Sequence, residues 1–143
     1  MLIVLCGLPG AGKTTLSNKM AELYNAQIYH YDNWRPDLKR QSRILARNKM
    51  YSDIRSDLLH GIDVIIDDLH LRGKDRLKLL SFVSDIPCDK ILIVVDTPTD
   101  VCIFRNRHRK NRISDNFIYI AEKQFENPTL NEGWDSVIYY KGE

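Results

Sequence analysis

Eight residues near the start of the chain form a pattern that binds phosphate groups. Four residues separate Gly7 from Gly12, and Lys13 and Thr14 follow directly. In such a pattern the glycines let backbone amides turn toward the phosphates, the lysine bridges the β- and γ-phosphates, and the threonine hydroxyl binds Mg²⁺. The residues that we expect to contact a nucleoside triphosphate in this segment are Gly7, Pro9, Gly10, Ala11, Gly12, Lys13, Thr14 and Thr15.

Two adjacent carboxylates follow a second apolar run. The residues Val64-Ile65-Ile66 lead directly into Asp67 and Asp68. A buried strand that delivers carboxylates beside a phosphate loop is typical of a magnesium-binding segment. We expect one of the two to reach the magnesium shell through water, although either alone could instead cap a helix that begins near Lys74.

A third candidate group is Asp32, with Arg35 three residues later. If a helix starts at residue 33 or 34, both side chains point into the same space at the edge of the sheet. A carboxylate there can accept the proton of an attacking hydroxyl, and an arginine can hold an acceptor phosphate with two hydrogen bonds. The alternative for Asp32 is a helix N-cap.

A basic segment follows the third apolar run and a short helix expected from about Thr99. Its five cations lie within eight residues and are Arg105, Arg107, Arg109, Lys110 and Arg112. In nucleotide kinases a lid at this point closes over the triphosphate, and lid arginines balance the charge of the phosphoryl group in transfer. We therefore predict a short basic lid at residues 105–113, with a solvated basic face or a nonspecific polyanion patch as the alternative.

The elements that must position these groups alternate along the chain. Three apolar runs without polar alternation predict strands covered on both faces, and two weaker strands and the intervening helical segments complete the pattern. The expected strands are residues 2–6, 27–31, 64–66, 91–95 and 137–140, and the longer helical segments are 13–23 and 38–59. This order predicts an α/β fold of the P-loop NTPase type, with a five-stranded parallel sheet and helices on both sides.

The composition favours one small intracellular domain. The chain has 143 residues, 43% of them hydrophobic, and a net charge of +2, which suits a single domain spanning 1–143 without a strong overall charge. Three cysteines without metal-ligand spacing predict buried thiols in a reducing cytosol, and the four histidines show no zinc pattern. The first apolar run is too short to cross a membrane, so we expect a cytoplasmic protein without a membrane partner.

With these residues in place, the chain resembles the 5′-hydroxyl polynucleotide kinase family and the wider group of small P-loop kinases along nearly its whole length. The resemblance rests on the phosphate loop, Asp32 with Arg35, the acidic segment 64–71 and the basic segment 105–109. It also includes the tail 124–134, which has a phenylalanine-glutamate-x-proline-x-x-x-glutamate-glycine-aromatic pattern. Relatives that act on other hydroxyls share this tail pattern.

The resemblance implies a role for each matching residue. Asp32 falls on the general base, Arg35 on the acceptor-phosphate arginine, Asp68 on the essential aspartate and Arg109 on the lid arginine. Arg105 is expected beside the donor with Arg109. The chain departs from the family at Ser114, where a proline is frequent after the lid, and at His70, where an asparagine is frequent.

The implied reaction transfers the γ-phosphoryl group of ATP, or another nucleoside triphosphate, to the 5′-hydroxyl of DNA or RNA. Lys13 and Arg109 would balance charge on the donor, and Thr14 with Asp68, through water, would organise Mg²⁺. A ligase or repair protein is an expected partner. Only three residues follow the last expected strand, so we expect little recognition of the base and similar use of the four common triphosphates.

Two alternatives remain at this stage. The first is a P-loop kinase of a small hydroxyl substrate such as a nucleoside, an antibiotic or a sugar nucleotide. The second is a noncatalytic nucleotide-binding switch or nucleic-acid-binding module, which would have no use for Asp32 at the edge of the sheet.

Overall fold

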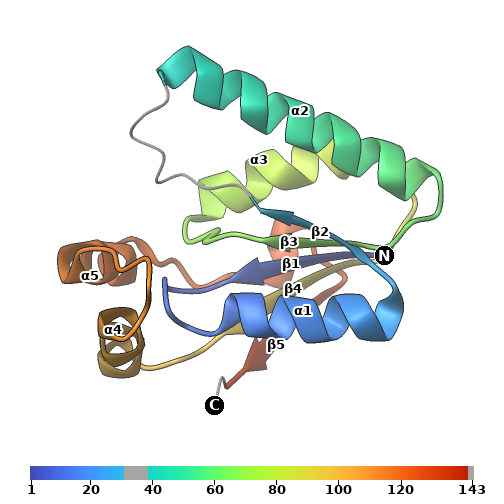
Figure 1. The fold of residues 1–143 in the computed structure, drawn as a ribbon. Coiled ribbons are helices and arrows are strands. Elements are labelled where there is room, and N and C mark those ends of the chain that lie inside the picture. The colour runs from blue at the N-terminus through green and yellow to red at the C-terminus, as the bar shows by residue number, and fades with distance from the viewer. Residues whose placement is uncertain (31–38, 142–143) are drawn as a thin grey trace.

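Five parallel strands form the centre of the molecule (Figure 1). A computed structural model gives the structure and describes residues 1–30 and 39–141. The strands are β1 (Leu2–Cys6), β2 (Gln27–His30), β3 (Val64–Asp67), β4 (Lys90–Val95) and β5 (Ser136–Tyr140). Their order in the sheet is β2-β3-β1-β4-β5. The carboxyl ends of all five strands therefore lie at one edge of the sheet, where ligands bind in open α/β folds.

The central strands consist almost wholly of buried apolar residues. Every residue of β1 and β3 is buried, as expected for strands covered by helices on both faces. In the pairing of β1 with β3, Leu5 lies opposite Asp67. Because the phosphate loop follows β1 directly, this register brings Asp67 next to the loop.

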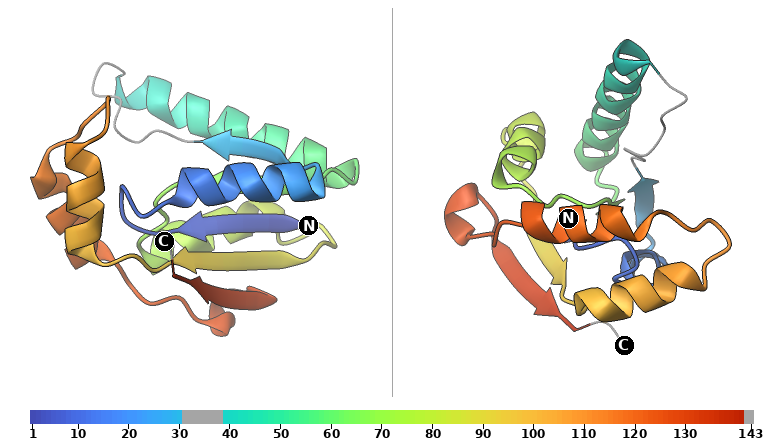
Figure 2. Two further views of the ribbon diagram at one scale, coloured as in Figure 1. Left: turned by 60° about the horizontal axis from the view of Figure 1, so that its bottom comes forward. Right: turned by 90° about the vertical axis from the view of Figure 1, so that its left-hand side faces the viewer.

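The helices divide between the two faces of the sheet (Figures 1 and 2). They are α1 (Lys13–Tyr24), α2 (Arg40–Leu59), α3 (Gly73–Val83), α4 (Thr99–Arg107) and α5 (Asp115–Gln124), and a 3₁₀ turn spans Leu130–Glu132. Side chains of α2 and α3 pack on one face, and those of α1, α4 and α5 pack on the other. Figure 2 shows α4 and α5 lying across the carboxyl edge of the sheet.

Alternation along the strands produces two cores. Leu2, Val4 and Ile66 point toward α2 and α3, where they meet Ile54 and Leu79. On the other face, Ile3, Leu5 and Ile65 pack with Cys102, Ile103 and Ile118. Successive side chains of a strand point to opposite faces, so the residue that ends a strand has its direction set by this pattern.

The expected α/β sheet of five parallel strands with helices on both sides is confirmed, and the differences are small. The helix expected from residue 38 begins at Arg40, and the lid region consists of the end of α4 and the loop to α5. Cys88 is half-buried, whereas Cys6 and Cys102 are buried as expected. Asp32 and Arg35 lie outside the described residues. Among residues 1–30 and 39–141, none of the helices combines the length and apolar character that crossing a membrane requires.

Candidate active site

The phosphate loop between β1 and α1 has a backbone that only glycine suits. Gly10 and Gly12 have φ angles of +83° and +103°, a region that disfavours other side chains. A Cβ atom on Gly10 would lie 2.8 Å from the carbonyl oxygen of Cys102, and one on Gly7 would lie 2.9 Å from that of Val95. The loop is therefore pressed against the end of β4 and against α4.

Lys13 is held by the loop that it follows. Its ammonium group donates hydrogen bonds to the carbonyl oxygens of Gly7, at 3.0 Å, and Leu8, at 2.8 Å. Burial lowers the pKa of Lys13, and the carboxylates of Asp67 and Asp68 oppose this shift. A phosphate oxygen would offer this buried cation a charged acceptor in place of the neutral carbonyls.

Three side chains converge on one oxygen of Asp67. The hydroxyl groups of Thr14 and Ser17 lie 3.0 and 3.2 Å from Oδ2, and Nδ1 of His30 lies 3.4 Å from it. Asp67 points this way because it lies two residues after Ile65 and so faces α1. Asp67, rather than Asp68, is therefore the carboxylate in contact with Thr14. The metal role that the family resemblance implies for Asp68 stays a prediction.

Asp68 faces a different environment. One of its carboxylate oxygens accepts a hydrogen bond of 2.7 Å from the amide of Leu69. Burial raises the pKa of Asp68, while His70 and the amide of Leu69 oppose the shift. Asp68 follows the last residue of β3, and the hydroxyl of Thr14 donates its hydrogen bond to Asp67 instead.

Two arginines of the basic segment face the phosphate loop. Arg105 points its Nη1 atom at the carbonyl oxygens of Ala11, at 3.3 Å, and Gly10, at 3.5 Å. Arg109 lines the same cavity as the loop. Both residues therefore lie beside the phosphate loop, and their contact with a donor stays a prediction.

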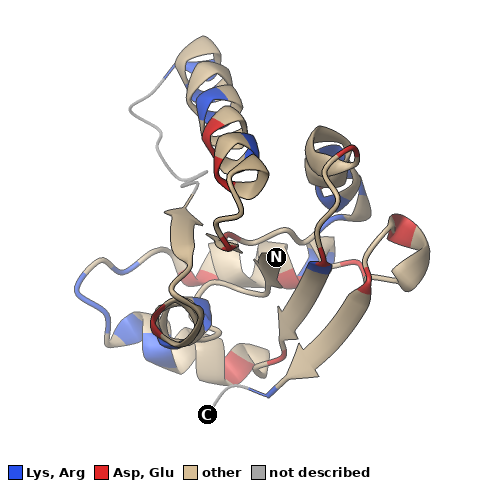
Figure 3. Ribbon diagram, turned by 90° about the vertical axis from the view of Figure 1, so that its right-hand side faces the viewer, with Lys and Arg blue, Asp and Glu red and all other residues tan. Residues whose placement is uncertain are grey.

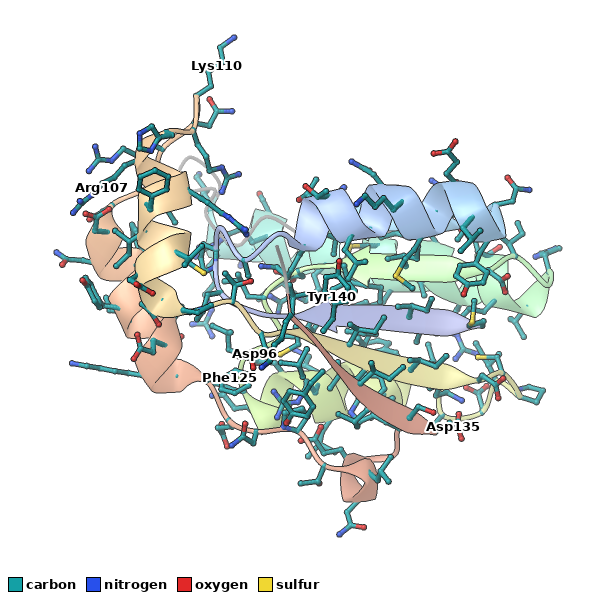
Figure 4. The ribbon with its side chains drawn as sticks, turned by 90° about the horizontal axis from the view of Figure 1, so that it is seen from below. Asp96, Arg107, Lys110, Phe125, Asp135 and Tyr140 are labelled. Carbon is teal, nitrogen blue, oxygen red and sulfur yellow. The ribbon has the colours of Figure 1, made fainter. Side chains whose placement is uncertain are left out.

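The other cations of this segment point elsewhere. Arg107 and Arg112 pair with Asp115, at 2.9 and 3.8 Å. Figure 4 shows Arg107 on the outer side of α4 and Lys110 extending away from the body of the molecule. The loop between α4 and α5 is drawn largely blue in Figure 3, yet only part of its charge is directed at the site.

A cavity of about 460 Å³ brings most of the expected residues together, and we call it the loop cavity. It is lined by Pro9, Gly10, Gly12, Lys13, Thr14, Thr15, His30, Asp67, Asp68, Leu69, Arg105 and Arg109. Gly7 and Ala11 also belong to the loop, but they are buried and do not line the cavity. The loop cavity thus combines three cations, Lys13, Arg105 and Arg109, with the carboxylates of Asp67 and Asp68.

Sequence reasoning missed three residues of this region. Ser17 lies one helical turn after Thr14, and a small polar residue at that spacing was an available signal. His30 ends β2, and no sequence pattern indicated that it would approach Asp67.

Arg76 has a fully buried guanidinium group that pairs with Glu132 at 3.0 Å, and Trp134 donates a hydrogen bond to the same carboxylate at 2.9 Å. The tail pattern of residues 124–134 therefore has a structural function, since it encloses Arg76.

No metal cage is formed by protein groups in the described part of the chain. Within residues 1–30 and 39–141, His, Cys, Asp and Glu side chains do not assemble in groups of three or more that could hold a metal. Thr14 and Asp67 nevertheless provide two oxygen ligands beside the loop. Such a sparse oxygen set fits Mg²⁺, which keeps several waters and takes its remaining ligands from substrate phosphates.

A curated protein is similar to this chain in sequence. L-seryl-tRNA(Sec) kinase of Methanococcus maripaludis is 28% identical over 143 residues, covering 94% of this chain and 56% of that protein. The chain spans about half the length of the curated relatives it matches.

Two solved structures share the fold. Chaetomium thermophilum Kti12, in complex with ADP-AlF3, superimposes with a TM-score of 0.74 at 19% identity, covering 99% of this chain and 89% of that one. A chain of the Pnkp1/Rnl/Hen1 RNA repair complex gives 0.75 at 18% identity, covering 86% and 43%. Residues 2–128 match the family described as an AAA domain. The chain therefore belongs to that AAA domain family, and its fold is that of a P-loop kinase-like domain.

Proposed function

We propose that this protein transfers the γ-phosphoryl group of a nucleoside triphosphate to a hydroxyl group of a nucleic acid, with the 5′-hydroxyl of DNA or RNA as the first choice of acceptor. The observation that carries the proposal is the loop cavity, whose lining combines Lys13, Arg105 and Arg109 with the carboxylates of Asp67 and Asp68. Such a cavity can bind a polyphosphate and balance the charge that moves during transfer.

The donor half of the reaction rests on the described residues. Backbone amides of the loop and Lys13 would hold the β- and γ-phosphates, and the N-terminus of α1 adds its positive dipole. Thr14 and Asp67 would hold Mg²⁺, which balances charge on the phosphate oxygens when bound. Arg105 and Arg109 would neutralise the phosphoryl group during transfer, with ATP or another nucleoside triphosphate as donor.

The acceptor half rests on residues outside the described part of the chain. The acceptor oxygen forms a bond to the γ-phosphorus while the bond from that phosphorus to the β,γ-bridging oxygen breaks, so a nucleoside diphosphate leaves. In this proposal Asp32 takes the hydroxyl proton and Arg35 holds an acceptor phosphate. Catalysis depends mainly on positioning and charge, because phosphoryl transfer needs little covalent chemistry from the protein.

The names of the relatives support a nucleic-acid acceptor. One relative is a kinase of L-seryl-tRNA(Sec), and one structural neighbour belongs to an RNA repair complex. The first of these also supports a second candidate acceptor, a hydroxyl group carried by an aminoacyl-tRNA. We further propose that the protein works as a single kinase domain in the cytoplasm. A ligase or repair protein is its proposed partner.

A transfer assay tests the proposal. The protein is incubated with γ-labelled ATP, Mg²⁺ and a panel of acceptors: 5′-hydroxyl DNA and RNA oligonucleotides, seryl-tRNA, and free nucleosides. We expect label on the oligonucleotides, and its loss in the variant Asp32→Asn with triphosphate affinity kept within a few-fold.

Each alternative predicts a different result. Label on seryl-tRNA alone would select the second acceptor, and label on nucleosides alone would select a small-molecule kinase. Binding of ATP without transfer to any acceptor would support a noncatalytic module. Wild-type rates in Asp32→Asn would show that Asp32 is not the proton acceptor.

A further inference from the structure

A second, smaller cavity lies on the other side of the segment that follows β3. Its volume is about 110 Å³, and we call it the helix cavity because α2 and α3 supply much of its wall. It shares Asp68 and Leu69 with the loop cavity. A molecule bound in the helix cavity would therefore be separated from a triphosphate in the loop cavity by little more than these two residues.

Cations outnumber carboxylates in the wall of the helix cavity. Arg47 comes from α2, Arg72 caps the N-terminus of α3 and Lys78 lies on α3, whereas the carboxylates are Asp68 and Asp75. Figure 3 shows both helices on the same side of the sheet, each with blue segments. Two guanidinium groups, which bind phosphate through paired hydrogen bonds, give this cavity the chemistry of an anion site.

The floor of the helix cavity is fixed by a buried network. Arg76 donates hydrogen bonds of 2.9 Å to the carbonyl oxygens of His70 and Leu71, which both line the cavity. The same guanidinium binds both carboxylate oxygens of Glu132 at 3.0 Å and the carbonyl of Glu126 at 2.9 Å. Its side chain is 0% exposed. The backbone beneath the cations is thus held in place by the protein alone, which reduces the cost of ordering the site when a ligand binds.

We propose that the helix cavity binds a phosphodiester group of the acceptor strand, with Arg47 and Arg72 as its main ligands. This inference rests on the proposed function, since it assumes an acceptor that is a nucleic acid. The strand would enter between α2 and α3, and its bound phosphate would help to direct the accepting hydroxyl past Asp68 toward the donor.

A charge-matched pair of double variants tests the inference. Arg47→Ala/Arg72→Ala removes the two ligands, and Lys49→Ala/Lys74→Ala removes two exposed cations of the same helices that do not line the cavity. Binding of a fluorescent 5′-hydroxyl oligonucleotide is measured by anisotropy over a range of salt concentrations, and triphosphate binding is measured by calorimetry.

We expect the cavity variant to bind the oligonucleotide roughly tenfold more weakly and to reduce the salt slope of log K by about 1. Triphosphate affinity should remain within twofold in both variants, which shows that each is folded. In the transfer assay the cavity variant should raise KM for the oligonucleotide more than it lowers kcat.

Two results would overturn the inference, and they differ in what else they overturn. If both double variants weaken oligonucleotide binding equally, only overall charge matters, and if neither weakens it, none of these four cations takes part in binding. In either case the helix cavity is no phosphate site, while the proposed function stands. If the wild-type protein binds no oligonucleotide and phosphorylates only small hydroxyl compounds, the proposed function fails as well.

Discussion

The two cavities beside Asp67 and Asp68 are built in different ways. The loop cavity takes half of its lining residues from one continuous segment, Pro9 to Thr15, whose backbone conformation depends on glycines. The helix cavity takes its lining from α2, α3, the segment after β3 and Gln124, and its floor is tied to the tail through Arg76. The site that we propose for the donor is thus encoded largely by one local segment, whereas the site that we propose for an acceptor phosphate depends on tertiary packing.

This difference has a consequence for specificity. A phosphate loop offers the same backbone and lysine to every triphosphate, so it does little to distinguish one kinase from another. The side chains of α2 and α3 that line the helix cavity do not line the loop cavity, and the amide of Gly7 joins the loop to the carbonyl oxygen of Leu69, at 3.1 Å, through backbone atoms alone. We therefore expect substitutions on the two sides to have separable effects.

The largest expected effect is on stability, from Arg76→Ala. This change leaves Glu132 without its partner in the protein interior, and loss of one member of a buried ion pair costs about 3–5 kcal/mol. The matched control is Arg55→Ala, which breaks an ion pair of 2.7 Å with the exposed Asp85 and should cost much less, because solvent screens this pair. Urea unfolding measures both. Equal losses would mean that the Arg76 network does not hold the fold.

The next effect is on the donor, from Lys13→Ala. Loss of a buried cation that faces the phosphates should lower triphosphate affinity and turnover together, by roughly 10²- to 10³-fold, or about 2.7–4 kcal/mol. Calorimetry with Mg²⁺ and ATP measures the triphosphate affinity. Lys19→Ala, an exposed position on the same helix, is the control. Unchanged affinity in Lys13→Ala would remove the loop cavity as the donor site.

A smaller effect separates the two carboxylates. Asp67→Asn should raise the Mg²⁺ concentration needed for half-maximal activity by roughly 10- to 100-fold, the usual cost of losing a group that supports a metal. Asp68→Asn should leave that concentration nearly unchanged, since Thr14 contacts Asp67. Magnesium titrations of the transfer rate measure both values. The opposite ranking would return the metal role to Asp68.

Much of the fold and of the donor side could be predicted from sequence. Continuous apolar runs such as Leu2–Cys6 identify buried parallel strands, and the loop pattern identifies its own conformation because glycine is required at positive φ. The direction of Asp67 could be predicted as well. Alternation along Val64–Asp67 places Asp67 on the face of Ile65, toward α1, whereas Asp68 follows the end of the strand.

The acceptor side could not be predicted in the same way. Arg76 and Glu132 are 56 residues apart, and no local pattern indicates that a buried arginine will find its partner at that distance. The cations of the helix cavity come from α2, from Arg72 just before α3 and from α3 itself, so their proximity depends on how the two helices pack. Periodicity identifies each helix but does not specify which of its polar residues will face a neighbouring helix.

The smallest expected effect is a change in Tm that depends on pH, from Asp68→Asn. Burial raises the pKa of this carboxyl in the folded protein above its ordinary value of 3.8. A raised pKa means that the stability associated with the protonated group is present below the unfolded-state value and is lost as the pH rises through the folded-state value. At neutral pH the ionised Asp68 is therefore a net cost to the fold, and Asp68→Asn should raise Tm. The rise should shrink as the pH falls, because the wild-type carboxyl then gains its proton.

Thermal unfolding of both proteins between pH 4 and 7.5 measures the difference in Tm. Asparagine retains an oxygen that can accept the hydrogen bond from the amide of Leu69. A lower Tm for Asp68→Asn at neutral pH would mean that attraction to His70, Lys13 and Arg47 outweighs the cost of burial. The ionised Asp68 would then stabilise the folded protein.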